Sequence, residues 1–397
     1  MRIVLSSESY WPNKDGGAVF EHRLVSELVA AGHEVAVLAP GQHWRSSIQH
    51  DDAGVIYRTP SVVLPFSKRQ YRVTYYARSQ VRRMMREFCP EVIHIHTMGI
   101  LGSCLLRAAQ RRGLPVVATN HLMPENLLMS MPSWIQKNAW LHRIMWKRIV
   151  AFHERCDIVT SPTPSATALL TRYGLTRPLY AISNGMDTTD YRPANPQESS
   201  IGVLKDLGIG RRDYVLYLGR IGAEKRIDTL LEAYATLAHE YPTHDLVIAG
   251  KGNRLEALQR RARELGCDDR THFTGLVTDE QKKSLYQQAA LYCITSPAEL
   301  QSITTMEAMA SGLPIIAVDV VALHELCHDG KNGYLIPVDD VEACARKLRL
   351  LLNDEARRHK FGEWSREYII AHHDNRRTYE QFTALYHQLI CEPPQHT

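Results

Sequence analysis

The sequence predicts an α/β protein made of two successive doubly wound domains, each a parallel sheet covered by helices. The chain has 397 residues, more than one domain of about 100–200 residues needs. Short apolar runs rich in β-branched residues alternate with segments of helical periodicity, as in sheets joined by crossover helices. This alternation pauses in the Pro-, Asn- and Ser-bearing stretch Tyr191–Ile201 and then restarts, which indicates a second domain.

The first half of the chain contains six strand candidates. They are Arg2–Ser7, His33–Leu38, Val92–Thr97, Pro115–Thr119, Asp157–Thr160 and Leu179–Ser183. Between them we expect helices over Ala18–Ala31 and Gly99–Arg112. Gly32 and Gly113 follow these two segments directly, as glycine often does where a helix ends.

The second half repeats the pattern. Its strand candidates are Tyr214–Leu218, Asp245–Ala249, Thr271–Thr274, Leu291–Thr295, Pro314–Val318 and Gly333–Ile336. The tail after Asn353 has helical periodicity only. We therefore expect an N-terminal domain over residues 1–187 and a C-terminal domain over 188–374, with a helix at about 375–392 that packs back on the first domain.

Composition excludes several classes of protein. Hydrophobic residues make up 44% and charged residues 23%, which is typical of soluble globular chains, and the net charge of +4 is too balanced to indicate a nucleic-acid protein. The eight cysteines form no CxxC pair, so neither a zinc site nor a disulfide framework is indicated. No secretion signal and no run of eighteen apolar residues is visible. We expect a cytoplasmic location.

The most informative stretch is Leu291–Pro314. A buried strand leads into a polar loop with Glu299, and a helix opens at about Ser302 and carries Glu307. The free N–H groups at such an opening, at the carboxyl edge of a parallel sheet, favour an anionic ligand. The two carboxylates can accept hydrogen bonds from hydroxyl groups, which suits a ligand made of phosphate and sugar. Alternatively, Glu299 is an ordinary loop acid and Glu307 an exposed helical one.

Two further loops carry features of a phosphate site. Gly219 and Arg220 follow the strand Tyr214–Leu218, and Lys225 comes five residues later, so positive charge can lie over a pyrophosphate at the sheet edge. The alternative is a solvated basic loop. Gly16 and Gly17, after the first strand, allow a ligand to approach the backbone closely, although a plain turn explains them equally.

Other known motifs are missing. The loop with Gly250 and Gly252 does not complete a GxGxxG fingerprint because position 255 is Leu, which disfavours a nicotinamide dehydrogenase. The sequence contains no GxSxG, P-loop or strand-borne DxD motif. We therefore expect no metal and no cofactor. Among the histidines, His121 follows a strand at the sheet edge and is a candidate for a site, although a core or surface role is the more ordinary explanation for any one histidine.

Together these features resemble the retaining glycosyltransferases of family 4, which have the GT-B fold. The resemblance covers essentially the whole chain. It is carried by Gly16-Gly17, Val92–Thr97, Ile182–Asp187, Gly219-Arg220 with Glu224-Lys225, Ala249–Gly252, and the E-x7-E pair Glu299 and Glu307 followed by Ala308–Pro314. It implies two Rossmann-like domains facing a central cleft, with a nucleotide-sugar donor on the C-terminal domain and the acceptor on the N-terminal one.

The resemblance also implies roles for individual residues. Arg220 and Lys225 would hold the diphosphate. Glu307 would bind the ribose hydroxyls and Glu299 the hydroxyls of the donor sugar. His121 matches the active-site histidine of the N-terminal domain.

The remaining donor contacts implied by the family come mainly from loops. The expected donor-binding positions besides those four side chains are Gly16, Gly17, Gly219, Gly250, Gly252, Gln301, Ser302 and Ile303. Such enzymes retain the anomeric configuration, and the leaving phosphate helps to deprotonate the acceptor. UDP-hexose is the first choice of donor by family frequency, and the acceptor is a hydroxyl of a lipid or glycan.

Two stretches bear on the acceptor. Lys68–Phe88 contains seven basic residues and one acid with three interleaved tyrosines, and Ser133–Cys156 combines three tryptophans with five basic residues. Basic helices with aromatic faces are typical of anionic membrane surfaces, so peripheral attachment to the inner face of a membrane is one expectation. Alternatively, these helices pack one face on the sheet and expose the other. No nucleic-acid recognition motif accompanies the cations.

Three other functions remain open from sequence. A GT-B nucleotide-sugar 2-epimerase would use the same donor motifs without an acceptor. A non-catalytic sensor of nucleotide sugars is disfavoured because the donor motifs and His121 are all present. A transferase acting on a soluble small molecule differs only in its acceptor, and Glu125 in the loop after His121 leaves acceptor identity open.

Overall fold

The computed structural model describes residues 1–13, 16–51, 54–63, 72–128, 138–195, 201–210 and 213–392. The chain divides into two compact units. Unit 1 comprises Met1–Pro124, Asn138–Gly185 and Arg376–Thr397, and unit 2 comprises Glu125–Lys137 and Met186–Asn375. The sequence predicts a domain boundary after residue 187, and in the structure the chain passes from unit 1 to unit 2 after Gly185.

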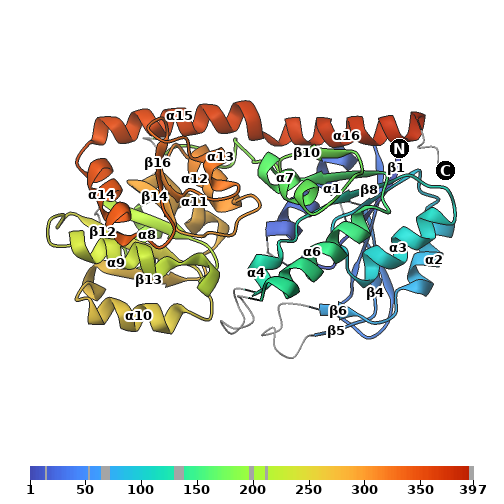
Figure 1. The fold of residues 1–397 in the computed structure, drawn as a ribbon, viewed down its shortest axis with the longest axis horizontal. Helices are drawn as coiled ribbons and strands as arrows, with labels where there is room; N and C mark the ends of the chain where they lie inside the picture. The colour runs from blue at the N-terminus through green and yellow to red at the C-terminus, as the bar shows by residue number, and fades with distance from the viewer. Residues whose placement is uncertain are drawn as a thin grey trace. The chain divides into compact units, whose positions relative to one another are not determined.

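Unit 1 is built on an eight-stranded sheet in the order β10-β9-β8-β7-β1-β2-β4-β3 (Figure 1). Its strands are β1 (Arg2–Ser6), β2 (Glu34–Pro40), β3 (Ser47–Asp51), β4 (Gly54–Thr59), β7 (Val92–Ile95), β8 (Val116–Thr119), β9 (Ile158–Ser161) and β10 (Leu179–Ala181). β3 runs antiparallel to β4 at one edge, and the other neighbours pair in parallel. β5 (Ser61–Val63) and β6 (Arg72–Thr74) form a separate antiparallel pair.

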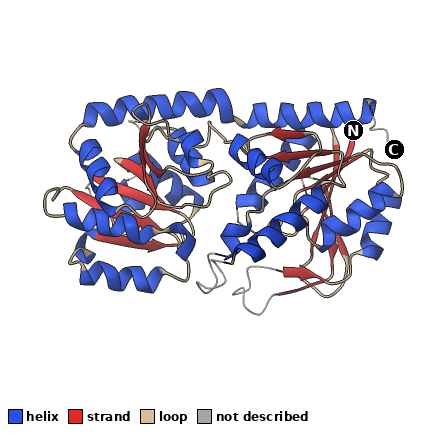
Figure 2. Ribbon diagram, in the orientation of Figure 1, coloured by secondary structure: helices blue, strands red, loops and turns tan. Residues whose placement is uncertain are grey.

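Helices cover both faces of this sheet (Figure 2). They are α1 (Gly16–Ala30), α2 (Arg78–Glu87), α3 (Ile100–Gln110), α4 (Pro124–Leu128), α6 (Ala139–His153), α7 (Pro164–Arg172) and α16 (Asn375–Cys391). One core cluster joins α1 and α16 to the sheet through side chains such as Leu24, Phe382 and Tyr386. A second cluster joins α2 and α3 to the opposite face through Val81, Met84 and others. Alternate strand residues supply both cores, as a parallel sheet buried on two faces requires.

Unit 2 has a six-stranded sheet in the order β13-β12-β11-β14-β15-β16, with all neighbours parallel. Its strands are β11 (Asp213–Leu218), β12 (His244–Ala249), β13 (Thr271–Gly275), β14 (Leu291–Ile294), β15 (Ile315–Val318) and β16 (Gly333–Ile336). Its helices are α8 (Ile201–Asp206), α9 (Ile227–Leu237), α10 (Leu255–Glu264), α11 (Asp279–Gln288), α12 (Ile303–Ala310), α13 (Leu323–Leu326), α14 (Val341–Leu352) and α15 (Glu355–His373), with short 3-10 turns at Ala223–Lys225 and Asp268–Arg270. One continuous core unites these elements.

Each sheet has a switch point where the strand order reverses. In unit 2 it lies between β11 and β14, and in unit 1 between β1 and β7. Loops that leave the carboxyl ends of the two central strands diverge there, which leaves room for a ligand in folds of this kind. We therefore expect each unit to bind its ligand at its own switch point.

The chain passes between the units at two neighbouring points of unit 2. Met186 forms an isolated β-bridge with Asp374, and the Met186 N–H donates to the His373 carbonyl at 2.7 Å. The Thr188 hydroxyl donates to the Asp374 carboxylate at 2.6 Å. After Asn375 the chain belongs to unit 1 again, where α16 packs beside β1 (Figure 1).

The expected basic helices differ from what the structure contains. Within Lys68–Phe88, residues 68–71 lie outside the described part, and the rest divides into β6 and α2, so the cations do not share one helix. The apolar side of α2 is buried in the core. In Ser133–Cys156, residues 133–137 are likewise outside the description, Trp146 is buried against Tyr173, and Trp140 is 71% exposed. No helix in the described ranges is long and apolar enough to span a bilayer.

Candidate functional site

The loops after β11 and β12 in unit 2 lie against each other. The Gly219 N–H donates to the Ala249 carbonyl at 3.0 Å, and the Ile221 N–H donates to the Lys251 carbonyl at 2.9 Å. Gly250 has φ +141°, and a Cβ atom there would lie 1.9 Å from the Gly219 carbonyl oxygen. A Cβ atom on Gly252 would meet the Ile221 carbonyl equally closely. Only glycine permits this contact, so the three glycines predicted as donor-binding positions fix the shape of this edge.

Lys225 and Glu299 meet across the switch point of unit 2. Lys225 ends the 3-10 turn after β11, Glu299 lies in the loop after β14, and their Nζ and Oε1 atoms are 2.5 Å apart. The Thr295 hydroxyl, just beyond β14, donates to the backbone carbonyls of Lys225 and Arg226 at 3.1 and 2.8 Å, which holds the two loops together. Both side chains of the pair are mostly buried. Glu299 is therefore not an isolated loop acid.

Arg220 lies at the same edge of the sheet. Its guanidinium makes an ion pair of 2.7 Å with Glu224, whose carboxylate is buried, while half of the arginine side chain stays exposed. The Arg220 carbonyl accepts a hydrogen bond of 2.9 Å from the Tyr217 hydroxyl. The arginine is thus anchored at its backbone and through its partner, and its exposed face can contact an anion.

The loop after Glu299 ends at the N-terminus of α12. Ser302 is the N-cap residue, and its side chain accepts a hydrogen bond from the Thr305 N–H. Gln301 and Ser302 are buried and Ile303 begins the helix. The three positions predicted to contact a donor through their amides therefore lie in sequence at a capped helix start, where the helix dipole favours negative charge.

Glu307 lies inside α12 and is only 3% exposed. Its Oε1 atom is 2.6 Å from Lys282 Nζ, and its Oε2 atom accepts a hydrogen bond of 3.0 Å from the Tyr286 hydroxyl. Burial raises the pKa of Tyr286 well above its ordinary value, and the neighbouring Glu307 charge adds to this, so the phenol remains a donor. The alternative of an exposed helical Glu307 is wrong.

The partners of Glu307 were not among the residues predicted from sequence. Lys282 and Tyr286 both lie on α11, four residues apart, and so share one helix face. In the sequence, the only sign of these partners is that Lys282 falls on the same helix face as Leu285 and Tyr286. This pattern does not indicate which carboxylate the lysine meets.

The predicted site residues of unit 1 lie around its own switch point. Gly16 and Gly17 begin α1, and Phe20, one turn further, contacts the His121 ring edge-on with ring centroids 5.5 Å apart. His121 Nε2 is 3.4 Å from Nδ1 of His96, which follows β7. Burial lowers the pKa of His121 to about 4, with a contribution from His153, so its imidazole is neutral near pH 7.

Two more buried histidines support His121. His94 receives or donates hydrogen bonds of 2.6 Å with the Tyr386 hydroxyl of α16 and with the Thr119 hydroxyl. Its ring packs on His96 with centroids 3.9 Å apart. Burial lowers the pKa of His94 to about 3 and that of His96 well below its ordinary value.

Glu21 of α1 joins this group and was not predicted. One potential metal-ligand atom each from Glu21, His96 and His121 lies within 4.8 Å of the others. Glu21 is buried among the apolar residues Phe20, Leu24 and Val25 of the core face of α1. A charged residue at a core position of an amphipathic helix was the sequence signal that could have found it.

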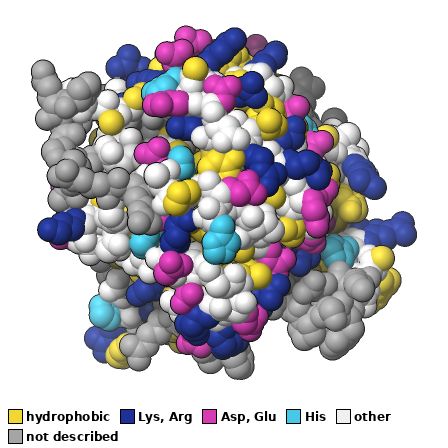
Figure 3. Space-filling view, turned by 90° about the vertical axis from the view of Figure 1, so that its left-hand side faces the viewer, with side chains coloured by type: hydrophobic (Ala, Val, Ile, Leu, Met, Phe, Trp, Pro, Cys, Tyr) yellow, Lys and Arg dark blue, Asp and Glu magenta, His cyan; other side chains and the backbone are white. Residues whose placement is uncertain are grey.

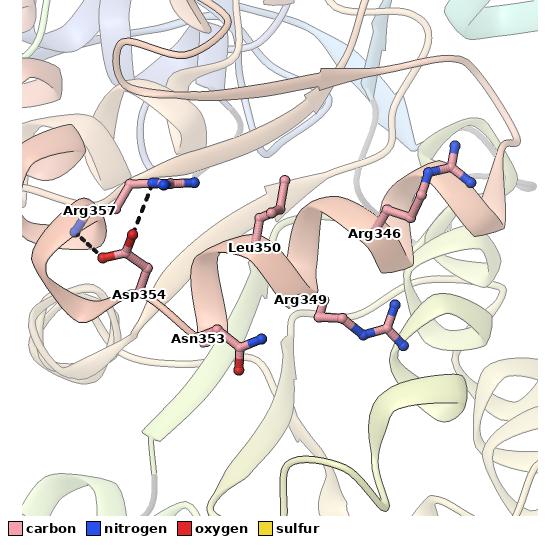
Figure 4. Close-up of a pocket in the computed structure, with 6 residues that line it drawn as sticks. All are labelled: Arg346, Arg349, Leu350, Asn353, Asp354 and Arg357. Atoms are coloured by element: carbon pink, nitrogen blue, oxygen red, sulfur yellow. Dashed lines mark hydrogen bonds and ion pairs between the residues drawn. The ribbon is translucent and has the colours of Figure 1, made fainter.

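A surface pocket of unit 2 contains several arginines but differs from the switch-point site. Its volume is about 540 Å³, and it is lined by Arg346, Arg349, Leu350, Asn353, Asp354 and Arg357 of α14 and α15 (Figure 4). Arg349 is paired with Glu240 and Arg357 with Asp354. On the face drawn in Figure 3, positive and negative side chains are interspersed among the described residues. Two of the three arginines of the pocket are thus paired with carboxylates, which reduces the positive charge available to an anion.

The comparisons with known proteins agree with this geometry. Residues 14–190 match the model of Glycosyltransferase Family 4, and residues 204–368 match that of Glycosyl transferases group 1. The chain belongs to glycosyltransferase family 4 and has the GT-B fold. It is thus a glycosyltransferase.

Curated relatives span most of the chain. An alpha-monoglucosyldiacylglycerol synthase of Streptococcus pneumoniae is 29% identical over 338 residues, which cover 84% of this chain and 75% of the relative. A GDP-mannose-dependent alpha-mannosyltransferase of Mycolicibacterium smegmatis is 29% identical over 379 residues, which cover 94% of this chain and 93% of the relative.

Solved structures share the fold over nearly the full length. Sucrose-phosphate synthase from Thermosynechococcus elongatus matches with a TM-score of 0.80 and 22% identity, covering 98% of this chain and 99% of that one. HepE from Anabaena, in complex with UDP, matches with a TM-score of 0.77 and 17% identity, and the match covers 98% of this chain and 100% of HepE.

Proposed function

We propose that this protein is a retaining hexosyltransferase that moves a hexose from a nucleoside diphosphate sugar to a hydroxyl group of a lipid or glycan acceptor. The observation that carries the proposal is the Lys225–Glu299 pair at the switch point of unit 2, next to Arg220. A cation for a diphosphate and a carboxylate for sugar hydroxyls lie side by side there. Folds of this type bind ligands at that edge.

The charge distribution suits departure of a diphosphate. Arg220, Lys225 and the N-terminus of α12 present positive charge around one edge of the sheet. Negative charge on the leaving phosphate grows as the glycosidic bond breaks, so these groups stabilise the transition state more than the ground state. Glu299 would orient the sugar hydroxyls, and Glu307, already fixed by Lys282 and Tyr286, would accept hydrogen bonds from the ribose.

The proposed transfer needs no metal and no cofactor, because fixed cations and backbone N–H groups supply the stabilisation. We assign a catalytic role to the neutral His121 of unit 1, because it occupies the position where the family has its active-site histidine. Retention follows from same-face attack, in which the leaving phosphate receives the proton of the acceptor hydroxyl.

As substrates we propose UDP-hexose as the donor and a membrane lipid as the acceptor. HepE was solved with UDP, and the glucosyldiacylglycerol synthase is named for a lipid product. The mannosyltransferase relative is named for GDP-mannose, which makes GDP-mannose the main competing donor. A lipid acceptor agrees with the exposed Trp140 and with the exposed arginines of α2. We infer that the enzyme acts at the cytoplasmic face of a membrane.

The test is product analysis with a panel of donors. Purified protein is incubated with UDP-glucose, UDP-galactose, UDP-N-acetylglucosamine or GDP-mannose, with and without membrane lipids, and the products are identified by mass spectrometry. We expect a hexosylated lipid that forms with one UDP-hexose and keeps the donor's α configuration. Conversion of the donor into an epimer without any acceptor would replace the transferase proposal by the 2-epimerase.

A further inference from the structure

Three side chains that can ligate a metal converge at the carboxyl edge of the unit 1 sheet. Glu21 comes from α1, His96 directly follows β7, and His121 follows β8 by two residues. One potential ligand atom of each lies within 4.8 Å of the others. α1 and β7 border the switch point between β1 and β7, where a ligand is expected.

The distance between the two imidazoles fits a shared metal ion. His96 Nδ1 and His121 Nε2 are 3.4 Å apart, which is longer than the usual hydrogen-bond range of about 2.7–3.2 Å. In a tetrahedral zinc site with Zn–N bonds of about 2.0–2.1 Å, two nitrogen ligands lie roughly 3.3–3.4 Å apart. The pair therefore already has the separation that a zinc ion requires.

The hydrogen bonding of His96 agrees with a ligand at its Nδ1 atom. The side chain is 2% exposed, and within the described ranges its Nε2 atom has no hydrogen-bond partner. Its Nδ1 atom has only the long contact with His121. An ion bound to Nδ1 would give this nitrogen the close partner that the 3.4 Å contact does not supply, whereas Nε2 would stay without a partner in either case.

The surroundings suit a metal ion as well. Two imidazoles and one carboxylate form the donor set of many catalytic zinc sites, in which a fourth position stays open. Burial keeps both imidazoles in the neutral form that binds metals. His94, held by Tyr386 and Thr119, packs on His96 and fixes its ring. His121 is half-buried, whereas Glu21 and His96 are buried.

We propose that Glu21, His96 and His121 bind a divalent transition-metal ion of the zinc class, with one coordination position left for an external ligand. The ion would occupy the lone pair of His121, so we expect it to inhibit sugar transfer. The binding itself does not depend on the proposed function, whereas the inhibition rests on it.

The first experiment measures binding of the metal alone. The full chain is stripped with EDTA, dialysed against Zn²⁺ at pH 7.5, and analysed for zinc by plasma emission. We expect one zinc per wild-type chain and a loss of at least tenfold in zinc affinity for Glu21→Gln and His121→Gln. His359→Gln, which changes an exposed histidine of α15 that lies 3.7 Å from Glu355, is the matched control and should keep the zinc.

Two measurements separate loss of the site from loss of the fold. Far-ultraviolet circular dichroism should be unchanged in both variants, and Co²⁺ should give a tetrahedral visible spectrum with wild type but not with folded His121→Gln. Wild type without bound zinc, or folded Glu21→Gln and His121→Gln with wild-type affinity, would overturn the proposal.

The second experiment concerns activity. Zn²⁺ should inhibit wild type over the concentrations that fill the site, and inhibition of Glu21→Gln should need at least tenfold more. Zinc that binds through these residues without inhibiting transfer would support the metal site and contradict the role of His121 in the proposed reaction.

Discussion

Lys225 supplies the positive charge on which the proposed reaction depends most directly. It is held 2.5 Å from Glu299, and the Thr295 hydroxyl fixes its backbone. A preorganised cation costs no rearrangement at the moment of reaction, which is why fixed charges contribute strongly to catalysis. Arg220 complements it from the same edge of the sheet.

Removing either cation should reduce the turnover of protein that is still folded. For Lys225→Ala and Arg220→Ala we expect kcat to fall by about 10²–10³, equivalent to about 2.7–4 kcal/mol of transition-state stabilisation for one lost donor. Arg220→Ala also leaves the buried Glu224 carboxylate without its cation, so this variant should lose stability as well, by about 1–3 kcal/mol. Steady-state kinetics and urea unfolding measure the two effects.

Arg349→Ala provides the matched control. Arg349 pairs with Glu240 at 2.9 Å with similar exposure, but it lies on α14 away from the site loops. It should keep wild-type turnover. Wild-type kcat in the Lys225→Ala/Arg220→Ala double variant would contradict the site assignment.

The buried histidines should make stability depend on pH. Burial lowers the pKa of His94 to about 3 and that of His121 to about 4, from an ordinary value of 6.5. Between pH 6.5 and 4 the unfolded chain binds protons that the folded chain does not. The free energy of unfolding should therefore fall as the pH falls through this window, by an amount on the order of a few kcal/mol.

Substituting one histidine tests this cause. In His121→Gln, the slope of the unfolding free energy against pH between 4 and 6.5 should decrease by about one proton, or about 1.4 kcal/mol per pH unit. Urea titrations at several pH values give the slope. His359→Gln, at an exposed position of α15, should leave it unchanged, and equal slopes in the two variants would show that burial of His121 is not the cause.

Among the structural elements, α16 has the most unusual position in the chain. It follows unit 2 in sequence but supplies Phe382, Tyr386 and Leu389 to the core of unit 1. Tyr386 also bonds His94, which packs on His96. One helix therefore supports both the core and the histidine group of unit 1.

Truncation of Phe382 should destabilise unit 1 specifically. The side chain is fully buried, so Phe382→Ala is expected to cost about 3–5 kcal/mol of unfolding free energy. Glu380→Ala, at an exposed position of the same helix, should cost less than about 0.5 kcal/mol. Hydrogen exchange read out by mass spectrometry should place the lost protection in β1, β7 and α1. Lost protection confined to unit 2 would contradict the packing of α16.

Elements with a buried apolar run could be predicted from sequence, and polar ones could not. β1 and β14 have such runs, whereas β3, with the sequence SIQHD, is largely exposed and has no apolar periodicity. β3 was missed for this reason, and β5 and β6, with three residues each, are too short to show a period. β4 was missed although its last four residues are buried. For the site, Lys225 and Glu299 could be proposed because each follows a strand.

Partners that depend on the packing of helices could not be predicted in this way. Lys282 meets Glu307 because α11 lies beside α12, and Glu21 lies near His96 because α1 packs on the sheet that contains β7. Local sequence carries no information on such a pairing, since it is determined by the arrangement of the whole sheet.

At the scale of the whole molecule, the proposed transfer is independent of metal ions. In the proposed complex, Arg220 and Lys225 at the switch point of unit 2 would face the diphosphate. Activity of the full chain should therefore survive 5 mM EDTA at more than about 80% of its untreated value, since no metal has to stabilise the leaving group. Loss of activity with EDTA and its recovery with Mg²⁺ or Mn²⁺ would contradict this account.

The distribution of arginines predicts binding to anionic membranes. Arg82, Arg83 and Arg86 are exposed on α2, whose apolar side is occupied by the core, so the contact should be electrostatic. Each cation near an anionic leaflet contributes about 1 kcal/mol, screened by salt. Co-sedimentation with vesicles should rise with anionic lipid, fall with salt, and fall again when the three arginines are changed to Gln.

A matched set of charges provides the control. Arg260, Arg263 and Arg346 of unit 2 are equally exposed, and changing them to Gln removes the same net charge. This variant should bind vesicles much as wild type does. Equal binding to neutral and anionic vesicles would indicate that α2 is an ordinary solvated helix and would favour a soluble acceptor.

The return of the chain to unit 1 through α16 affects the order in which the nascent protein can fold. During translation, Met186–Asn375 leaves the ribosome before α16 is made, so unit 2 can complete its core while unit 1 still lacks one of its helices. Until then, the apolar surface around Phe20 and His94 stays uncovered. The part of the protein that is synthesised first is thus completed last, and its apolar surface stays exposed for the whole time that unit 2 is being translated.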